Sequence, residues 1–241
     1  MYQGVATVRR CEAVNSFVHI VELVLEEAVD YIPGQYLMVN MGEGDQRPFS
    51  IASIPAHGKE VTLHIGASPD NPYAWEVLER IQRERAISVS LPHGNAGYEP
   101  TRSRPLLLIA GGTGFSYAWS ILQAHLARTE TQPVLLYWGV REEADLYYHE
   151  ALVEMAKRFA NLTYVPVVER PQDENWADPR GKVLDVVIDD LSATTSAAAE
   201  GMKAYDVYIA GRFDMVRVAR DQFTALGLPK DQLFGDALSF I

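Results

Sequence analysis

The chain has 241 residues, of which 48% are hydrophobic and 22% charged, so it is long enough for one large globular domain or two smaller ones. Its net charge of −11 argues against nucleic acid as a partner, because phosphate binding depends on clustered Lys and Arg; the acidic excess otherwise favours solubility. The single cysteine, Cys11, excludes an internal disulfide and a multi-cysteine iron-sulfur or zinc site, and we interpret it as a buried or incidental residue. We therefore expect no metal, and any redox group must be organic or borrowed from another molecule.

No apolar run reaches the ~20 residues that span a bilayer. The opening segment MYQGVATVRR also lacks the hydrophobic stretch of a signal peptide. The expected location is the cytoplasm, without membrane contact. No apolar stripe is visible beyond the expected core elements, which favours a monomer or a weak dimer.

Short β-rich runs separated by turn formers fill the first part of the chain, a pattern that predicts a small antiparallel barrel. The runs cover residues 4–10, 17–25, 36–41, 60–66 and 86–91, and the turns lie at 33–34, 42–45 and 57–58. One helix is expected over residues 72–82. Asn71 is its expected N-cap, Pro72 its first residue, and Trp75, Leu78 and Ile81 its apolar face.

From Arg104 onward, apolar strands alternate with helices. The strands are expected over residues 105–110, 133–139, 161–168 and 205–210, and the helices over 115–128, 143–159, 183–191 and 213–226. Strands that are apolar throughout are usually buried on both faces, so this half predicts a parallel sheet covered by helices. We place the boundary in the Gly-, Asn- and Pro-rich stretch 93–105, which gives domains 1–101 and 102–241. The Ser/Thr/Ala-rich segment 192–199 is interpreted as a loop.

A glycine-rich turn, Gly111-Gly112-Thr113-Gly114, lies between the strand PLLLIA and an amphipathic helix. Glycines allow a sharp turn close to a ligand, and the start of the helix offers amides and a positive dipole end to a pyrophosphate. The turn does not match the G-x-G-x-x-G fingerprint, and no acidic residue at the end of the second strand clearly binds a ribose. A purely structural turn is the alternative.

A second pattern places Arg47-Pro48-Phe49-Ser50 on one expected barrel strand and His64-Ile65-Gly66-Ala67-Ser68 on another. With these motifs the chain resembles the ferredoxin-NADP reductase superfamily, and more closely the bacterial NAD(P)H:flavin oxidoreductases of the Fre type and their luciferase-associated relatives. The resemblance runs in one order through GQYLMV, RPFSIAS, LHIGAS, PHG, LIAGGTGFSYAWSIL, YWGVREEADLY, VPVVE, YIAGRF and FGDALSFI.

The resemblance implies a flavin-binding antiparallel β-barrel followed by an α/β parallel-sheet domain that binds NADH or NADPH. The implied activity is hydride transfer from nicotinamide C4 to N5 of FMN, riboflavin or FAD, with Ser50 as the catalytic hydroxyl that hydrogen-bonds N5. The implied flavin contacts are Arg47, Pro48, Phe49, Ser50, His64, Ile65, Gly66 and Ala67. The implied dinucleotide contacts are Gly111, Gly112, Thr113, Gly114, Phe115, Ser116, Arg141, Gly211, Arg212 and Phe213.

Several of these residues also have plain structural interpretations. Arg47 could extend to solvent, as strand arginines usually do, and His64 could be a half-buried strand residue without a role in proton transfer. Arg141, which could meet a 2′-phosphate, could equally be a surface arginine. Phe234 and the closing Phe240-Ile241 could cover the flavin ring or pack against the sheet edge, and we favour packing.

Two departures from the superfamily pattern bear on function. Flavin-retaining members carry a small-residue motif with a Ser or Thr that grips the flavin phosphate, whereas this chain has Asp70-Asn71-Pro72-Tyr73-Ala74. A carboxylate at Asp70 and the missing hydroxyl at Ala74 predict weak binding of the phosphate, so the flavin should exchange as a substrate. In addition, Ala210-Gly211-Arg212-Phe213 replaces the Cys-Gly-Pro of many members, so hydride transfer would proceed without a thiol.

Free flavin reduction is therefore the expected function, with the reduced flavin serving a monooxygenase, a luciferase or ferric complexes. The first alternative is a reductase with tightly bound FAD that passes electrons to a protein partner. The second is a catalytically silent regulator that binds a dinucleotide. The sequence does not decide between NADH and NADPH, and it does not identify the preferred flavin.

Overall fold

The computed structural model describes residues 1–55, 58–69, 71–193 and 201–241. The expectations for the turn at His57, for Asp70 and for most of the 192–199 loop therefore concern residues outside this description. The chain forms two compact units: the first is Met1–Tyr98 with Trp119–Ala124, and the second is Glu99–Ala118 with His125–Ile241. Among the described residues, no helix has the length and apolar character that a membrane crossing requires.

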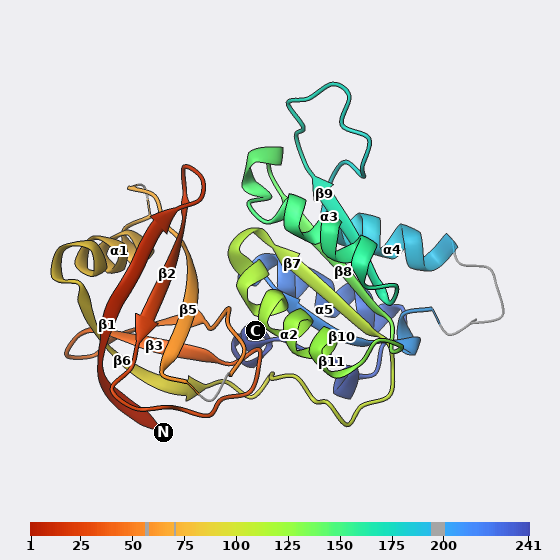
Figure 1. Ribbon diagram of the computed structural model, residues 1–241. Coiled ribbons are helices and arrows are strands. Elements are labelled where there is room, and N and C mark those ends of the chain that lie inside the picture. The colour runs from red at the N-terminus through yellow and green to blue at the C-terminus, as the bar shows by residue number, and fades with distance from the viewer. Residues whose placement is uncertain (56–57, 70, 194–200) are drawn as a thin grey trace. The chain divides into compact units, whose positions relative to one another are not determined.

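Six antiparallel strands form the sheet of the first unit, in the order β4-β3-β6-β1-β2-β5. They are β1 (Tyr2–Ala13), β2 (Val18–Val24), β3 (Tyr36–Gly42), β4 (Asp45–Ser50), β5 (Glu60–Gly66) and β6 (Ala86–His93) (Figure 1). The two outer strands meet, because Ile51 forms an antiparallel bridge with Leu63. Beside this bridge, the Ala52 amide donates to the Thr62 carbonyl at 2.8 Å. The expected antiparallel barrel is confirmed.

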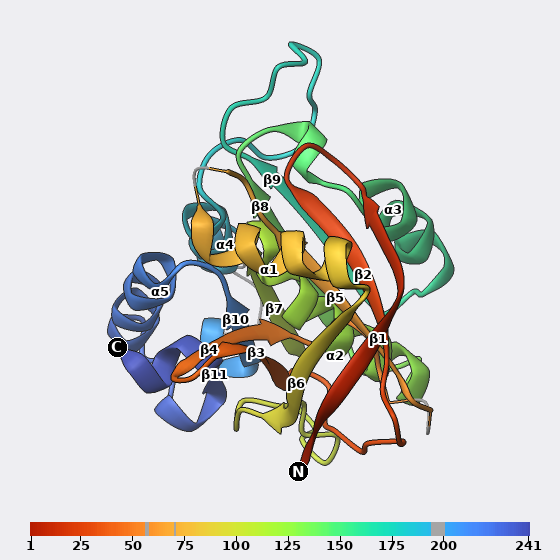
Figure 2. The same cartoon turned by 90° about the vertical axis from the view of Figure 1, so that its left-hand side faces the viewer.

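Helix α1 (Pro72–Glu84) lies against this sheet and contacts β1, β5 and β6 (Figure 2). Its buried face consists of Ala74, Val77, Leu78 and Ile81, which recur at the spacing of an amphipathic helix. Asn71 occupies the predicted N-cap position, but its side chain makes no capping hydrogen bond. The fixed φ of Pro72 at the first helical position is the feature that starts the helix.

Five parallel strands form the sheet of the second unit, in the order β11-β10-β7-β8-β9. They are β7 (Leu106–Gly111), β8 (Val134–Val140), β9 (Leu162–Val168), β10 (Asp206–Ala210) and β11 (Leu233–Phe234). The helices are α2 (Phe115–Arg128), α3 (His149–Arg158), α4 (Val183–Ala193) and α5 (Phe213–Ala225). The expected parallel sheet with helices is confirmed, and the two-residue strand β11 is an addition too short for a sequence pattern to reveal.

The prediction of one helix over residues 143–159 is wrong. A 3₁₀ turn at Glu143–Asp145 comes first, and α3 begins only at His149. The Glu142 and Asp145 side chains cap each other's backbone, which closes the short turn, and Leu146 then leaves the helical region with φ −81° and ψ 59°. The helical periodicity of the apolar residues did not indicate this interruption.

Helices cover both faces of the parallel sheet. Residues of α4 and α5 pack with Leu107, Ile109 and Val207 in one apolar cluster. Figure 1 shows α2 and α3 on the opposite face of the sheet. The strands are buried on both sides, as their continuous apolar runs predicted.

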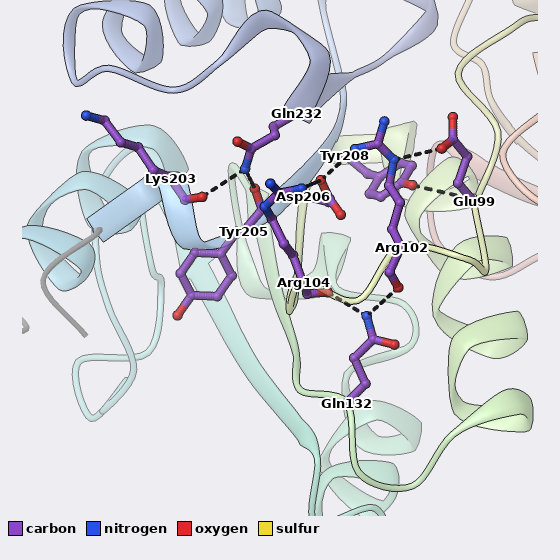
Figure 3. Close-up of polar contacts among 9 residues, drawn as sticks. All are labelled: Glu99, Arg102, Arg104, Gln132, Lys203, Tyr205, Asp206, Tyr208 and Gln232. Atoms are coloured by element: carbon purple, nitrogen blue, oxygen red, sulfur yellow. Dashed lines mark hydrogen bonds and ion pairs between the residues drawn. The ribbon is translucent and has the colours of Figure 1, made fainter. Parts of the chain in front are cut away.

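A polar network joins the starts of the strands in the second unit (Figure 3). Asp206 at the start of β10 is fully buried, and it accepts a hydrogen bond from Arg102 Nη1 at 3.1 Å, with Arg104 Nη1 at 3.7 Å. The Arg102 guanidinium also lies over the ring of Phe234, 4.7 Å from its centroid. Burial raises the pKa of the Asp206 carboxyl, so its ionised form depends on these two cations.

We expect Arg102→Ala to lower the free energy of unfolding by about 2–3 kcal/mol, because it leaves the buried Asp206 carboxylate without its nearest cation. Adding Asp206→Asn should recover part of this loss, since the uncompensated charge is then gone. Urea unfolding of the two single variants and the double variant measures the coupling. Strictly additive losses would contradict this account of the network.

Candidate functional site

The parallel sheet has one topological switch point, between β7 and β10. From β7 the chain proceeds to β8 and β9 on one side, and β10 lies on the other side of β7. Ligands of open α/β sheets bind at the carboxyl ends of the strands at such a point. Ala110 pairs with Ala210, so Gly111 and Gly211 follow at the ends of the two adjacent strands. The two glycine motifs singled out in the sequence therefore share one edge of the sheet.

The glycines at this edge have different structural roles. A Cβ at Gly111 or Gly211 would come within 2.5 Å or 2.8 Å of Met215 Sδ, and it would lie 3.7 Å or 3.5 Å from the Cα of the other glycine. A Cβ at Gly114 would lie 2.4 Å from the Ala210 carbonyl oxygen. Gly114 thus lies directly against the backbone of the other loop, whereas the space beside Gly111 and Gly211 is taken by the Met215 side chain.

Gly112 is the glycine that fits a ligand. It has φ +55°, a left-handed conformation that favours glycine, and a Cβ added there would meet no atom within 4 Å. The residue is exposed, and α2 starts three residues later. Open space beside backbone at the amino end of a helix is the geometry that receives a phosphate.

Two neighbouring residues predicted to contact the dinucleotide have inward-facing side chains. Phe115 is fully buried and stacks on Trp138 with ring centroids 3.9 Å apart. The Ser116 hydroxyl donates to the Thr113 carbonyl at 2.8 Å. Trp138 Nε1 donates to the Gly112 carbonyl at 2.9 Å, so the same indole that stacks on Phe115 also fixes the backbone of the turn. The side chains of Phe115 and Ser116 thus support the turn.

The remaining dinucleotide candidates are exposed at the same edge. Arg212 is the N-cap residue of α5, Phe213 is 54% exposed, and Arg141 follows directly after the end of β8. Sequence reasoning missed Met215, whose sulfur lies over both glycine loops. It also missed an open pocket of ≈ 490 Å³ lined by Leu146–Ala151, and the edge-on packing of Tyr147 against Trp138. The run Leu-Tyr-Tyr-His after a parallel strand was the available signal.

In the first unit, Arg47 does not extend to solvent. It is 8% exposed, and its guanidinium donates from Nε to Asp45 Oδ1 at 2.8 Å and from Nη2 to Asp45 Oδ2 at 2.6 Å. Nη2 also donates to Glu76 Oε2 at 2.7 Å, and Nη1 donates to the Tyr73 carbonyl at 2.5 Å. These two carboxylates raise the pKa of Arg47 further, so the guanidinium is always charged.

The strand alternation separates Arg47 from Ser50. Arg47 lies opposite Val39 of β3, whose side chain is in the core, and Ser50 lies opposite Tyr36. Residues that face each other across antiparallel strands share a face, and side chains alternate along a strand. Pro48 and Ser50 therefore lie on the face opposite Arg47 and Phe49. Ser50 is partly buried, and none of the described residues is in hydrogen-bond contact with its hydroxyl.

The β5 candidates are mostly core residues. His64 is 4% exposed, Ile65 is fully buried, and the Ala67 amide donates to the Phe17 carbonyl at 2.8 Å. Burial lowers the pKa of His64 to about 4, so the imidazole is neutral at pH 7 and donates no proton to a reacting group. His64 is thus a strand residue, but it is more deeply buried than the half-buried position expected from the sequence, and Gly66 at the end of β5 is the more accessible position.

The closing aromatic residues differ from each other. Phe234 stacks on Tyr208 with centroids 4.7 Å apart, as the packing interpretation predicted. Phe240 is 72% exposed and touches Phe213 edge-on at 6.2 Å, so the prediction that it packs against the sheet edge is wrong. Cys11 is only partly buried on β1.

Comparisons with known proteins agree with this arrangement. The oxidoreductase NAD-binding domain family matches residues 108–221, which include both glycine loops. The solved ferredoxin reductase of carbazole 1,9a-dioxygenase superposes with a TM-score of 0.82 at 24% identity, covering 98% of this chain and 69% of that one. This chain thus has the ferredoxin reductase-like fold, and residues 108–221 are similar to an oxidoreductase NAD-binding domain.

Two curated relatives are similar at higher identity. NAD(P)H-flavin reductase of Vibrio harveyi is 48% identical over 223 residues, which cover 90% of each chain. NAD(P)H-flavin reductase of Aliivibrio fischeri is 44% identical over 222 residues, again with 90% of each chain covered. The chain belongs to the family of NAD(P)H-flavin reductases and is an oxidoreductase, which confirms the resemblance drawn from its motifs.

The two classes of glycine should respond differently to a methyl group. We expect Gly114→Ala to cost about 3 kcal/mol of stability, because its Cβ would overlap the backbone oxygen of Ala210. Gly112→Ala should cost only about 1 kcal/mol, from the left-handed backbone alone. Urea unfolding of both variants makes the comparison, and equal losses would refute the assignment of roles.

The buried His64 should make the chain acid-sensitive. Its folded pKa lies below the unfolded value of 6.5, so its contribution to stability is complete above pH 6.5 and declines as the pH falls toward 4. Between pH 7.5 and pH 5 the chain should lose about 2 kcal/mol more than the His64→Gln variant, which cannot titrate. Urea unfolding at both pH values tests this, and parallel losses would show that His64 does not control acid stability.

Proposed function

We propose that the chain reduces free riboflavin, FMN or FAD with NADH or NADPH, by hydride transfer from nicotinamide C4 to flavin N5, and releases the reduced flavin. The observation that carries this proposal is the open, left-handed Gly112 at the switch point of the parallel sheet. It fits the pyrophosphate of a dinucleotide in a chain that is 48% identical to an NAD(P)H-flavin reductase.

We assign dinucleotide binding to residues 102–241. Gly112 and Thr113 would approach the pyrophosphate, while Gly111, Gly114 and Gly211 let the two loops pack beside it. Arg212 and Phe213 flank the same edge from the start of α5. Exposed Arg141 after β8 is the candidate for the adenosine end, and turnover with NADH and NADPH at equal concentration, with Arg141→Ala alongside, reveals any preference that it confers.

We assign flavin binding to residues 1–101. A flavin supplies a ring nitrogen that accepts a hydride, so the protein mainly has to position the two rings and needs no strong base. The partly buried Ser50 hydroxyl on β4 fits the role of hydrogen-bond partner to that nitrogen. Pro48 lies on the same face, whereas His64, Ile65 and Ala67 would support the site as core residues.

The flavin would exchange as a substrate. Ala74, at the position where flavin-retaining relatives carry a hydroxyl, is 6% exposed and packs in the core, so it offers no group to a phosphate. The released reduced flavin would then serve a monooxygenase or a luciferase as a substrate, or reduce a ferric complex. Gently purified protein that keeps stoichiometric FAD through dialysis would instead support the reductase with tightly bound FAD.

Ser50→Ala should lower kcat with riboflavin about tenfold to a hundredfold, because the hydroxyl is proposed to position the hydride acceptor. The KM for NADH should stay unchanged. Spectrophotometric loss of NADH, with and without riboflavin, measures both constants. Ser88→Ala, on the exposed face of β6, is the matched control and should behave like the parent chain. Unchanged turnover in Ser50→Ala would remove the catalytic assignment.

A further inference from the structure

Arg47 is a cation among the implied flavin contacts, but most of its hydrogen-bonding capacity is already used. A guanidinium has five N–H donors. Two of them bind Asp45, one binds Glu76 and one binds the Tyr73 carbonyl. At most one donor remains for any further group.

The charge of Arg47 is also overcompensated. Asp45 Oδ2 and Glu76 Oε2 lie 2.6 Å and 2.7 Å from the same Nη2 atom, so two carboxylates share one cation. Arg80 lies near enough to help lower the pKa of Asp45, and its Nη1 binds the Met41 carbonyl at 3.0 Å. Asp45, Arg47 and Glu76 together carry one net negative charge, and the positive charge of Arg80 balances it.

The two carboxylates come from different parts of the first unit. Asp45 begins β4, two residues before Arg47, whereas Glu76 comes from α1 and is half-exposed. The ring of Tyr73 lies 5.0 Å from the guanidinium carbon, which gives Arg47 a further contact with α1. Residues of helix α1 thus fix the position of the Arg47 guanidinium and weaken its attraction for other anions.

We propose that Glu76, with Asp45, sets the flavin specificity of the site by withholding Arg47 from the flavin phosphate, so that the uncharged riboflavin binds in preference to FMN. This inference rests on the proposed function and deepens it. A phosphate that approached Arg47 would have to displace a carboxylate or add its charge to two existing ones. Riboflavin carries no phosphate and meets no such penalty.

Glu76→Gln tests the proposal, because it keeps the shape of the side chain and removes one negative charge. Dissociation constants for riboflavin and FMN, measured by quenching of flavin fluorescence, need no turnover. We expect FMN affinity to rise about tenfold at low salt with riboflavin affinity unchanged, and the gain to shrink at high ionic strength. Glu79→Gln removes the same charge from the exposed side of the same helix and should leave both constants unchanged.

The outcomes separate this inference from the proposed function. If the parent chain oxidises NADH with riboflavin but Glu76→Gln and Glu79→Gln show the same ratio of FMN to riboflavin affinity, the specificity role of Glu76 is wrong and the activity stands. If neither flavin binds and riboflavin supports no NADH oxidation, the proposed function itself fails. If Glu76→Gln has the same dissociation constant for riboflavin as the parent chain, the variant is folded.

Discussion

The close approach of two backbones at the end of β7 and β10 is the constraint on which the second unit depends. Gly111 and Gly211 lie side by side without a Cβ between them, and Gly114 lies against the Ala210 carbonyl. Because the strands are adjacent at the switch point, a side chain at Gly114 would overlap the Ala210 backbone, and a side chain at Gly111 or Gly211 would meet Met215. Only with the loops this close does Gly112 present its backbone at the start of α2.

Much of this arrangement could be predicted from local patterns. Continuous apolar strands followed by helices predicted the parallel sheet, and β-rich runs between turn formers predicted the barrel. Each pattern is visible in the sequence because the apolar residues of an element mark the faces that it buries. Pro72 marked the start of α1 in the same way. The pattern failed at 143–159, where Glu142 and Asp145 close a turn through side-chain hydrogen bonds that apolar periodicity does not record.

Partners distant in sequence could not be predicted. The sequence shows Arg47 and Glu76 but not that the fold brings them within 2.7 Å, and it shows four glycines near two strands but not which of them meets backbone. The burial that lowers the pKa of His64 is likewise a property of the folded barrel. Each of these features is set by tertiary packing, which a single sequence read element by element does not contain.

The alternation of β4 gives the first unit two independent surfaces. Ser50 faces one side of the strand, and Arg47 faces the other beneath α1. On the proposed function, two different side chains of this short strand therefore act on the flavin. Ser50 would contact the ring, and Arg47 would determine how well the phosphate of the side chain binds. A change on α1, such as at Glu76, can alter the charge near the tail without moving the hydroxyl that faces the ring. The fold thereby separates the part of the flavin that reacts from the part that distinguishes one flavin from another.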